Sequence, residues 1–197
     1  MRTVFFVTFL ACISTSALAQ ETNPQARPVL HTTVDLSDRW FITDWAIGNV
    51  RAKTPSNFNL FPGLGLRSEK WWFEAMVQRQ WNPIGKNQWM LDFRSAGALN
   101  KRATLYLEWA PFLSQAGQYE FVQLNVRVYK QLSIGAESED VQRPGTDSWN
   151  IGPRLSFPVT SIGEYKLSLA VAYQIHYHEP DIPRLYIVLD RRFKRKS

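Results

Sequence analysis

The sequence has little of what would assign it to several common classes of protein. Its single cysteine, Cys12, excludes a disulfide-bonded scaffold and a zinc site built from cysteines. Beyond the first 19 residues it has no run of about 18 apolar residues, so no helical membrane span is expected. It has no Gly-x-Ser-x-Gly motif, and Gly63-Leu64-Gly65 lacks the third glycine of a dinucleotide-binding loop.

Aromatic residues, in contrast, are abundant. They make up 14% of the 197 residues and include 8 Trp and 12 Phe, while hydrophobic residues together make up 45%. A disordered chain would lack this apolar content, and the length suits one folded domain. The formal net charge is +6.

The first 19 residues have the pattern of a secretory signal peptide. Arg2 is their only charge, residues 4–13 are nearly all apolar, and Ala17-Leu18-Ala19 forms a small-x-small cleavage site. A buried first helix and a lipid-modified Cys12 are alternatives that these residues fit less well. We therefore predict that residues 1–19 are cleaved on export.

Most of the remaining chain alternates between apolar and polar residues with a period of two. In residues 122–128, for example, apolar residues at the even positions alternate with Gln, Asn and Arg at the odd positions. Successive side chains of a strand point to opposite faces, so this pattern predicts strands with one apolar and one polar face. The same alternation marks residues 71–81, 89–94, 104–109, 132–137, 149–157, 167–177 and 185–189.

Three further segments complete the predicted organisation. Residues 58–67 form a ninth strand, which Gly63 and Gly65 weaken slightly. Residues 35–47 fit either a strand or a short amphipathic helix. The polar residues 20–34 contain two prolines and are predicted to be an N-terminal linker, and residues 194–197 a basic C-terminal tail.

The strands fit two architectures, a membrane barrel with its apolar face outward or a soluble barrel with that face inward. Large aromatic residues gather at the strand ends, as in the girdles of membrane barrels. The polar face carries both signs of charge, which a narrow lumen can pair across its interior. The predicted aromatic girdle is Trp71, Trp81, Trp89, Trp109, Trp149, Tyr173, Tyr177 and Phe193; the predicted lumen charge network is Arg67, Glu74, Asp92, Arg94, Glu108, Arg127, Glu137, Arg154, Asp190 and Arg192.

The connections between strands alternate in length, as expected for long external loops and short periplasmic turns. An even number of strands requires residues 35–47 to be the first strand. We therefore predict an all-β, antiparallel, up-and-down transmembrane β-barrel of about ten strands over residues 35–193, with both ends in the periplasm. Eight strands is the alternative if residues 35–47 are a helix.

This organisation resembles the small outer-membrane β-barrel proteins of Gram-negative bacteria. The resemblance covers residues 35–193 and is architectural. Residues 185–193 look like the terminal strand that such proteins present to the barrel assembly machinery, with Phe193 as its aromatic end; the tail after Phe193 departs from that pattern. The resemblance implies a location in the outer membrane and contact with its lipid and lipopolysaccharide.

The residues that could carry chemistry do not form a complete site. His176 and His178 lie two apart, with Glu179 nearby, but further metal ligands cannot be named, and two polar rim residues are the simpler interpretation. No catalytic residues, metal site or cofactor is predicted. The basic tail would suit nucleic acid, but an exported protein does not meet it.

These observations favour a structural or interaction role for the barrel rather than an enzyme. Its loops would contact external partners or lipopolysaccharide, whose phosphates Arg51, Lys53, Arg79 and Lys86 could pair with near the external rim. Three alternatives remain: a narrow small-solute channel, a membrane-embedded lipid-modifying enzyme that uses His176, and a soluble lipocalin-like barrel around an apolar ligand.

Overall fold

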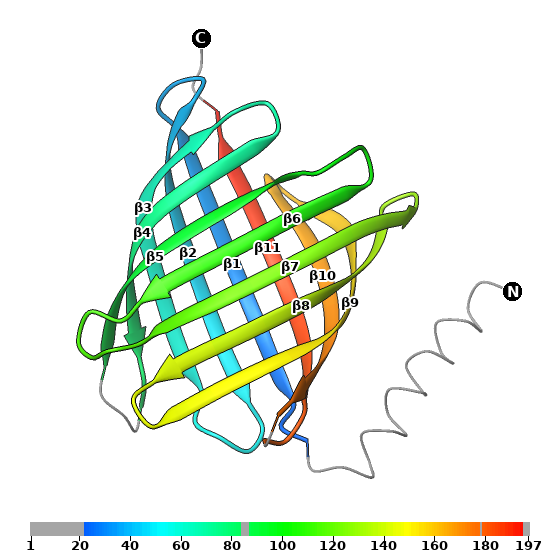
Figure 1. Ribbon diagram of the computed structural model, residues 1–197. Coiled ribbons are helices and arrows are strands. Elements are labelled where there is room, and N and C mark those ends of the chain that lie inside the picture. Colours follow the sequence, from blue (N-terminus) through cyan, green and yellow to red (C-terminus); the bar gives the residue numbers. More distant parts are fainter. Residues whose placement is uncertain (1–21, 84–86, 178, 195–197) are drawn as a thin grey trace, which may run out of the picture.

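Eleven strands in the described residues pair side by side into one closed sheet (Figure 1). The computed structural model describes residues 22–83, 87–177 and 179–194. Within these ranges no helix is long and apolar enough to cross a membrane. The strands are β1 (Gln25–Asp35), β2 (Trp40–Arg51), β3 (Asn57–Arg67), β4 (Trp71–Trp81), β5 (Gln88–Ala98), β6 (Ala103–Pro111), β7 (Gln118–Tyr129), β8 (Leu132–Arg143), β9 (Thr146–Ile162), β10 (Tyr165–His176) and β11 (Ile182–Phe193).

Consecutive strands run up and down, so the connections gather at two ends of the barrel. At one end, which we call the mouth end, four of the five connections have five or six residues; at the other, the turn end, all have two to four. In Figure 1 the mouth end lies toward the bottom and the turn end toward the top. The mouth end carries residues 52–56, 82–87, 112–117, 144–145 and 177–181, and the turn end residues 36–39, 68–70, 99–102, 130–131 and 163–164.

The barrel closes through a parallel pair, β1 beside β11, while every other neighbouring pair is antiparallel. The predicted all-β barrel is confirmed, but it has eleven strands where about ten were predicted. The extra strand is β1, which lies mostly in the predicted linker 20–34, and the predicted first strand 35–47 is displaced to Trp40–Arg51.

An odd number of strands places the two ends of the barrel sequence on opposite sides. The chain enters β1 at the mouth end and leaves β11 at the turn end (Figure 1). The prediction that both ends lie in the periplasm is therefore wrong. Pro24 and Pro28 concealed β1, because proline suggests a linker; Pro28 is accommodated in the strand beside Gly48, which leaves room for its ring.

The two faces of the sheet are chemically opposite. The outward face carries large exposed side chains, such as Val122, Leu124 and Ile134, whereas the inward face holds buried polar residues, such as Asp92 and Arg94. This distribution is typical of a membrane barrel and excludes the soluble lipocalin-like alternative, which required the apolar face inside.

Aromatic side chains of the outward face form a belt at each end. Trp81, Trp89, Trp109, Trp149 and Tyr177 project outward near the mouth end, and all are more than a third exposed. At the turn end, the corresponding residues are Trp40, Trp71 and Phe193. Tyr173 also belongs to the mouth half, where its hydroxyl donates a hydrogen bond of 2.9 Å to Asp181 Oδ2.

Replacing Gly152 with Ala tests the close approach of β9 and β10. A Cβ atom at Gly152 would lie 1.7 Å from the Tyr173 carbonyl oxygen, so the strands would have to separate. We expect a loss of about 1–3 kcal/mol in the free energy of unfolding, the usual cost of overpacking. Urea unfolding in detergent micelles, followed by the gel mobility of unboiled samples, measures this loss. Ile151→Leu, on the outward face, is the control; an unchanged midpoint for Gly152→Ala would contradict this register.

Candidate functional site

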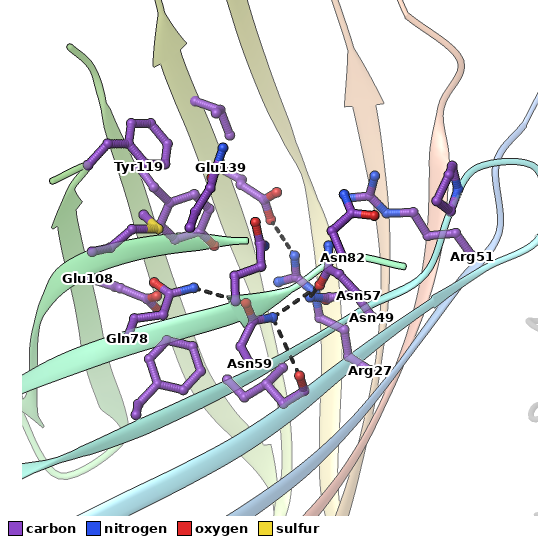
Figure 2. Close-up of a pocket in the computed structure, with 18 of the residues that line it drawn as sticks. Arg27, Asn49, Arg51, Asn57, Asn59, Gln78, Asn82, Glu108, Tyr119 and Glu139 are labelled. Atoms are coloured by element: carbon purple, nitrogen blue, oxygen red, sulfur yellow. Dashed lines mark hydrogen bonds and ion pairs between the residues drawn. The ribbon is translucent and has the colours of Figure 1, made fainter. Parts of the chain in front are cut away.

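A cavity of about 590 Å³ occupies the mouth half of the lumen (Figure 2). We call it the vestibule. It reaches from the mouth-end connections, at Pro55 and Asn82, down to Phe61, Glu108 and Glu139 inside the barrel. The strands bring these residues together because every second side chain points into the lumen.

One wall of the vestibule is a chain of hydrogen-bonded amides from neighbouring strands, which we call the amide belt. Asn49 Nδ2 donates to Asn57 Oδ1 at 2.7 Å, and Asn59 Nδ2 donates to the same oxygen at 3.0 Å. Gln78 Nε2 donates to Asn59 Oδ1 at 3.1 Å (Figure 2). Behind the wall, Gln25 Nε2 donates to Asn49 Oδ1 at 3.0 Å. Each amide has two donors and two acceptor sites, so the belt retains capacity to bind a polar solute.

The wall that continues from the amide belt, beginning at Met90 beside Gln78, is more apolar and includes Phe112 and Tyr119. Two cations, Arg51 and Arg143, also line the vestibule, and the Arg143 guanidinium lies 5.0 Å from the Phe112 ring centroid. Among the described residues, neither arginine has a carboxylate within ion-pair distance. The vestibule therefore combines neutral hydrogen-bonding groups, an aromatic wall and two unpaired positive charges.

Below the vestibule, a group of buried charged residues fills one side of the lumen. Glu139 accepts from Arg27 at 3.2 Å and from Arg184 at 2.8 Å. Glu137 accepts from Arg154 at 2.7 Å and from the Tyr186 hydroxyl at 2.7 Å. We call this group, with Gln174, which donates to Glu137 at 2.8 Å, the arginine plug.

A second group, the histidine cluster, fills the other side. His31 Nδ1 lies 2.7 Å from Asp190 Oδ1 and its Nε2 lies 3.4 Å from Glu74 Oε1. The His31 ring stacks on Trp45 with centroids 3.8 Å apart, and Trp45 Nε1 donates to Glu74 at 2.8 Å. His31 on β1 thus joins β1 to β2, β4 and β11.

Arg94 extends the histidine cluster toward the vestibule. Its Nε donates to Asp92 at 2.8 Å, its Nη2 donates to Glu108 at 3.4 Å, and its guanidinium lies 4.7 Å from the Trp45 ring. Tyr106 also donates to Glu108, at 3.0 Å. Because Asp92 and Arg94 are 0% and 1% exposed, this part of the lumen is filled by side chains in the structure.

A third contact closes the turn end. Asp35, the last residue of β1, pairs with Arg67 at 3.0 Å and with Arg192 at 2.9 Å. The Arg67 guanidinium also lies 4.0 Å from the Phe41 ring centroid. The lumen is therefore open as a vestibule at the mouth end and occupied by ion pairs beyond it.

The structure brings together most of the predicted lumen charges. The exception is Arg127, which is exposed at the turn end of β7 and forms no ion pair among the described residues. The charges that lie in the lumen contacts above are Arg67, Glu74, Asp92, Arg94, Glu108, Glu137, Arg154, Asp190 and Arg192.

Sequence reasoning missed the lumen charges of β1 and two more beside predicted strands. Arg27, His31 and Asp35 were placed in or beside a linker, although their spacing of four is compatible with one face of a strand. Glu139 and Arg184 lie just outside the predicted strands 132–137 and 185–189, at element boundaries, which are the hardest part of a strand to predict.

The four predicted lipopolysaccharide contacts separate in the structure. Arg79 points outward, with its guanidinium 4.5 Å from the Trp89 ring and 5.6 Å from the Trp81 ring. Lys53 is exposed in the mouth-end connection 52–56. Arg51 lines the vestibule instead of the outer rim, and Lys86 lies outside the described residues.

The histidine pair is only partly described, because His178 lies outside the described residues, as does the predicted signal peptide. His176 Nδ1 lies 3.4 Å from Glu179 Oε2, and its backbone N–H donates to Asp181. Within the described ranges, no group of three or more His, Cys, Asp or Glu residues could hold a metal ion.

The fold is a closed transmembrane β-barrel whose arrangement is similar to that of known porins. Two solved structures of similar fold are a KdgM porin, with a TM-score of 0.52, and a KdgM porin in complex with disordered oligogalacturonate, with a TM-score of 0.53. Each is 10% identical and is matched over 73% of this chain and 81% of its own. No protein-family model and no curated protein matches the sequence. The likeness confirms, at the level of fold, the predicted resemblance to outer-membrane barrels.

Replacing Glu137 with Gln tests the arginine plug. The change leaves Arg154 without its carboxylate partner inside the barrel, whereas Arg184 keeps Glu139, and breaking a buried pair typically costs about 3–5 kcal/mol. We expect a loss of that order in urea unfolding in micelles, and a double variant with Arg154→Gln that loses less than the sum of the two single losses. Glu120→Gln, outside the lumen, is the control. Additive losses would show that Glu137 and Arg154 are not coupled.

Proposed function

We propose that this protein is a narrow small-solute channel of the bacterial outer membrane whose lumen is closed at rest. The observation that carries the proposal is the vestibule, which opens at the mouth end and ends on the paired charges of the arginine plug and the histidine cluster. Ion pairs can exchange partners or accept water when a solute enters, whereas a packed apolar core would have to be unpacked. A lumen of this kind is therefore suited to opening.

The location in the outer membrane is supported by three independent features. The outward face is apolar and has an aromatic belt at each end, as expected for a barrel that crosses both interfaces of a bilayer. Residues 1–19 have the composition of a signal peptide, which would be cleaved on export from the cytoplasm of a Gram-negative cell. The fold resembles that of porins.

The walls of the vestibule favour a hydrophilic solute rich in hydroxyl groups. Amides donate to and accept from hydroxyls, and the aromatic wall beside them can cover the apolar face of a sugar ring. One of the structures with a similar fold is a porin in complex with oligogalacturonate, a saccharide. We propose saccharides as the solute class, with Arg51 and Arg143 able to bind an acidic substituent.

Planar-bilayer recordings test the channel. We expect small or absent current steps for the unaltered protein, because the lumen is filled, and larger steps for the double variant Glu139→Ala, Arg184→Ala, which removes a pair from the arginine plug without changing its net charge. The matched control is Glu164→Ala, Arg191→Ala, an ion pair on the outer surface. A double variant that folds but conducts no more than the control would contradict a channel role.

The same filled lumen supports a second candidate, a structural or interaction barrel that contacts lipopolysaccharide from outside. Arg79 is the residue that favours it. Its side chain points toward lipid between two tryptophans of the mouth-end belt and forms no ion pair within the described residues. An interfacial guanidinium held in this way can pair with a lipid phosphate.

Arg79→Gln tests this contact. We expect lipopolysaccharide added to micelles to raise the unfolding temperature of the unaltered protein, and this rise to shrink in the variant, since each such contact contributes about 1 kcal/mol. Arg191→Gln is the control, because Arg191 lies at the opposite end and is already paired with Glu164. If lipopolysaccharide raises the unfolding temperature equally in both variants, Arg79 does not contribute to lipopolysaccharide binding.

A further inference from the structure

Five exposed cations lie side by side at the turn end of β4 to β8, and we call them the turn-end basic patch. They are Lys70, Lys101, Arg102, Arg127 and Lys130. Backbone hydrogen bonds join their segments: Ala98 N–H donates to the Lys70 carbonyl at 3.0 Å, and Arg127 N–H donates to the Arg102 carbonyl at 2.8 Å. The patch therefore spans neighbouring turns and is a continuous surface.

None of the five cations has an ion-pair partner among the described residues. Of the other cations near the turn end, Arg191 pairs with Glu164, and Arg67 and Arg192 share Asp35. Arg39, Lys166 and Lys194 are also exposed without an ion pair among the described residues, but they lie on other turns than the patch. These five positive charges outnumber Glu69, the one exposed carboxylate in the same turns, so the surface is suited to an anionic partner.

Apolar side chains adjoin the basic patch and indicate the kind of anionic partner that would bind there. Leu99, Val128 and Tyr129 are 52%, 49% and 58% exposed, and Lys130 Nζ lies 5.5 Å from the Tyr129 ring centroid. Cations directly beside exposed aliphatic and aromatic residues are typical of the boundary between the lipid tails and the headgroups. A soluble polyanion would not require these apolar neighbours.

We propose that the turn-end basic patch binds the phosphate headgroups of anionic phospholipids in the periplasmic leaflet. The short connections at this end, and the end of β11 at Phe193, place it on the periplasmic side of an outer-membrane barrel. Five cations close to a lipid surface attract anionic headgroups strongly and are screened by salt. The proposal adds a lipid preference to the barrel and does not depend on whether the lumen conducts.

Native mass spectrometry of the full mature protein, titrated in separate samples with phosphatidylglycerol, phosphatidylcholine or lipopolysaccharide, tests the patch. We expect phosphatidylglycerol to bind more tightly than phosphatidylcholine. The double variant Arg102→Gln, Lys130→Gln should weaken phosphatidylglycerol binding by about tenfold or more, given the attraction of each basic residue to an anionic surface. Both side chains are exposed and unpaired, so the variant should still fold, which the gel mobility of unboiled samples verifies.

The control Lys53→Gln, Arg143→Gln removes the same charge at the mouth end and should bind phosphatidylglycerol like the unaltered protein. If both double variants bind phosphatidylglycerol equally weakly, the effect is due to net charge alone, and the proposed role of the patch is wrong. A patch variant that loses lipopolysaccharide but keeps phosphatidylglycerol would place the turn end in the outer leaflet and overturn the leaflet assignment. Bilayer recordings on the patch variant judge the channel separately, because Arg102 and Lys130 lie away from the vestibule and the plug.

Discussion

The parallel pairing of β1 with β11 is the contact on which the rest of the structure depends. It closes the barrel, makes the number of strands odd, and inserts Arg27, His31 and Asp35 into the lumen at three levels. Each of these residues then meets charges from other strands: Glu139 on β8, Glu74 and Asp190 on β4 and β11, and Arg67 and Arg192 on β3 and β11. Strand β1 therefore completes the wall of the barrel and also contributes side chains that fill the lumen.

A lumen filled with ion pairs differs in stability from one filled with apolar side chains. Two desolvated charges gain little net stability from each other, although either one left alone is costly. The arginine plug and the histidine cluster therefore keep the closed state specific without making it very deep in free energy. A lumen filled in this way is compatible with the proposed channel, in which the amide belt would be the first contact with a solute.

The period-two pattern was sufficient to predict the barrel, because an outward face in lipid and a polar inside force alternation on every strand. The pattern did not reveal β1, where prolines interrupt the alternation. As a result, the predicted number of strands and the predicted end at which the chain enters the barrel were both wrong. The pairing of charges could not be predicted, because Glu137 and Arg184 are brought together only by the relative shift of several strands. The vestibule was missed for the same reason, since its amides come from four separate strands.

The odd strand count also makes the two ends of the barrel chemically distinct. The mouth end presents the amide belt, the cations Arg51 and Arg143 and the start of β1, whereas the turn end presents the turn-end basic patch and the end of β11. A barrel that worked equally well in either orientation would not need ends that differ in this way. In a membrane whose two leaflets differ in lipid, a barrel with unlike ends has a preferred orientation, because reversal would place its exposed cations against different headgroups. If the proposed lipid contact holds, this orientation would also decide which compartment the vestibule faces, and so would link the charges outside the lumen to the solutes that reach the polar residues within it.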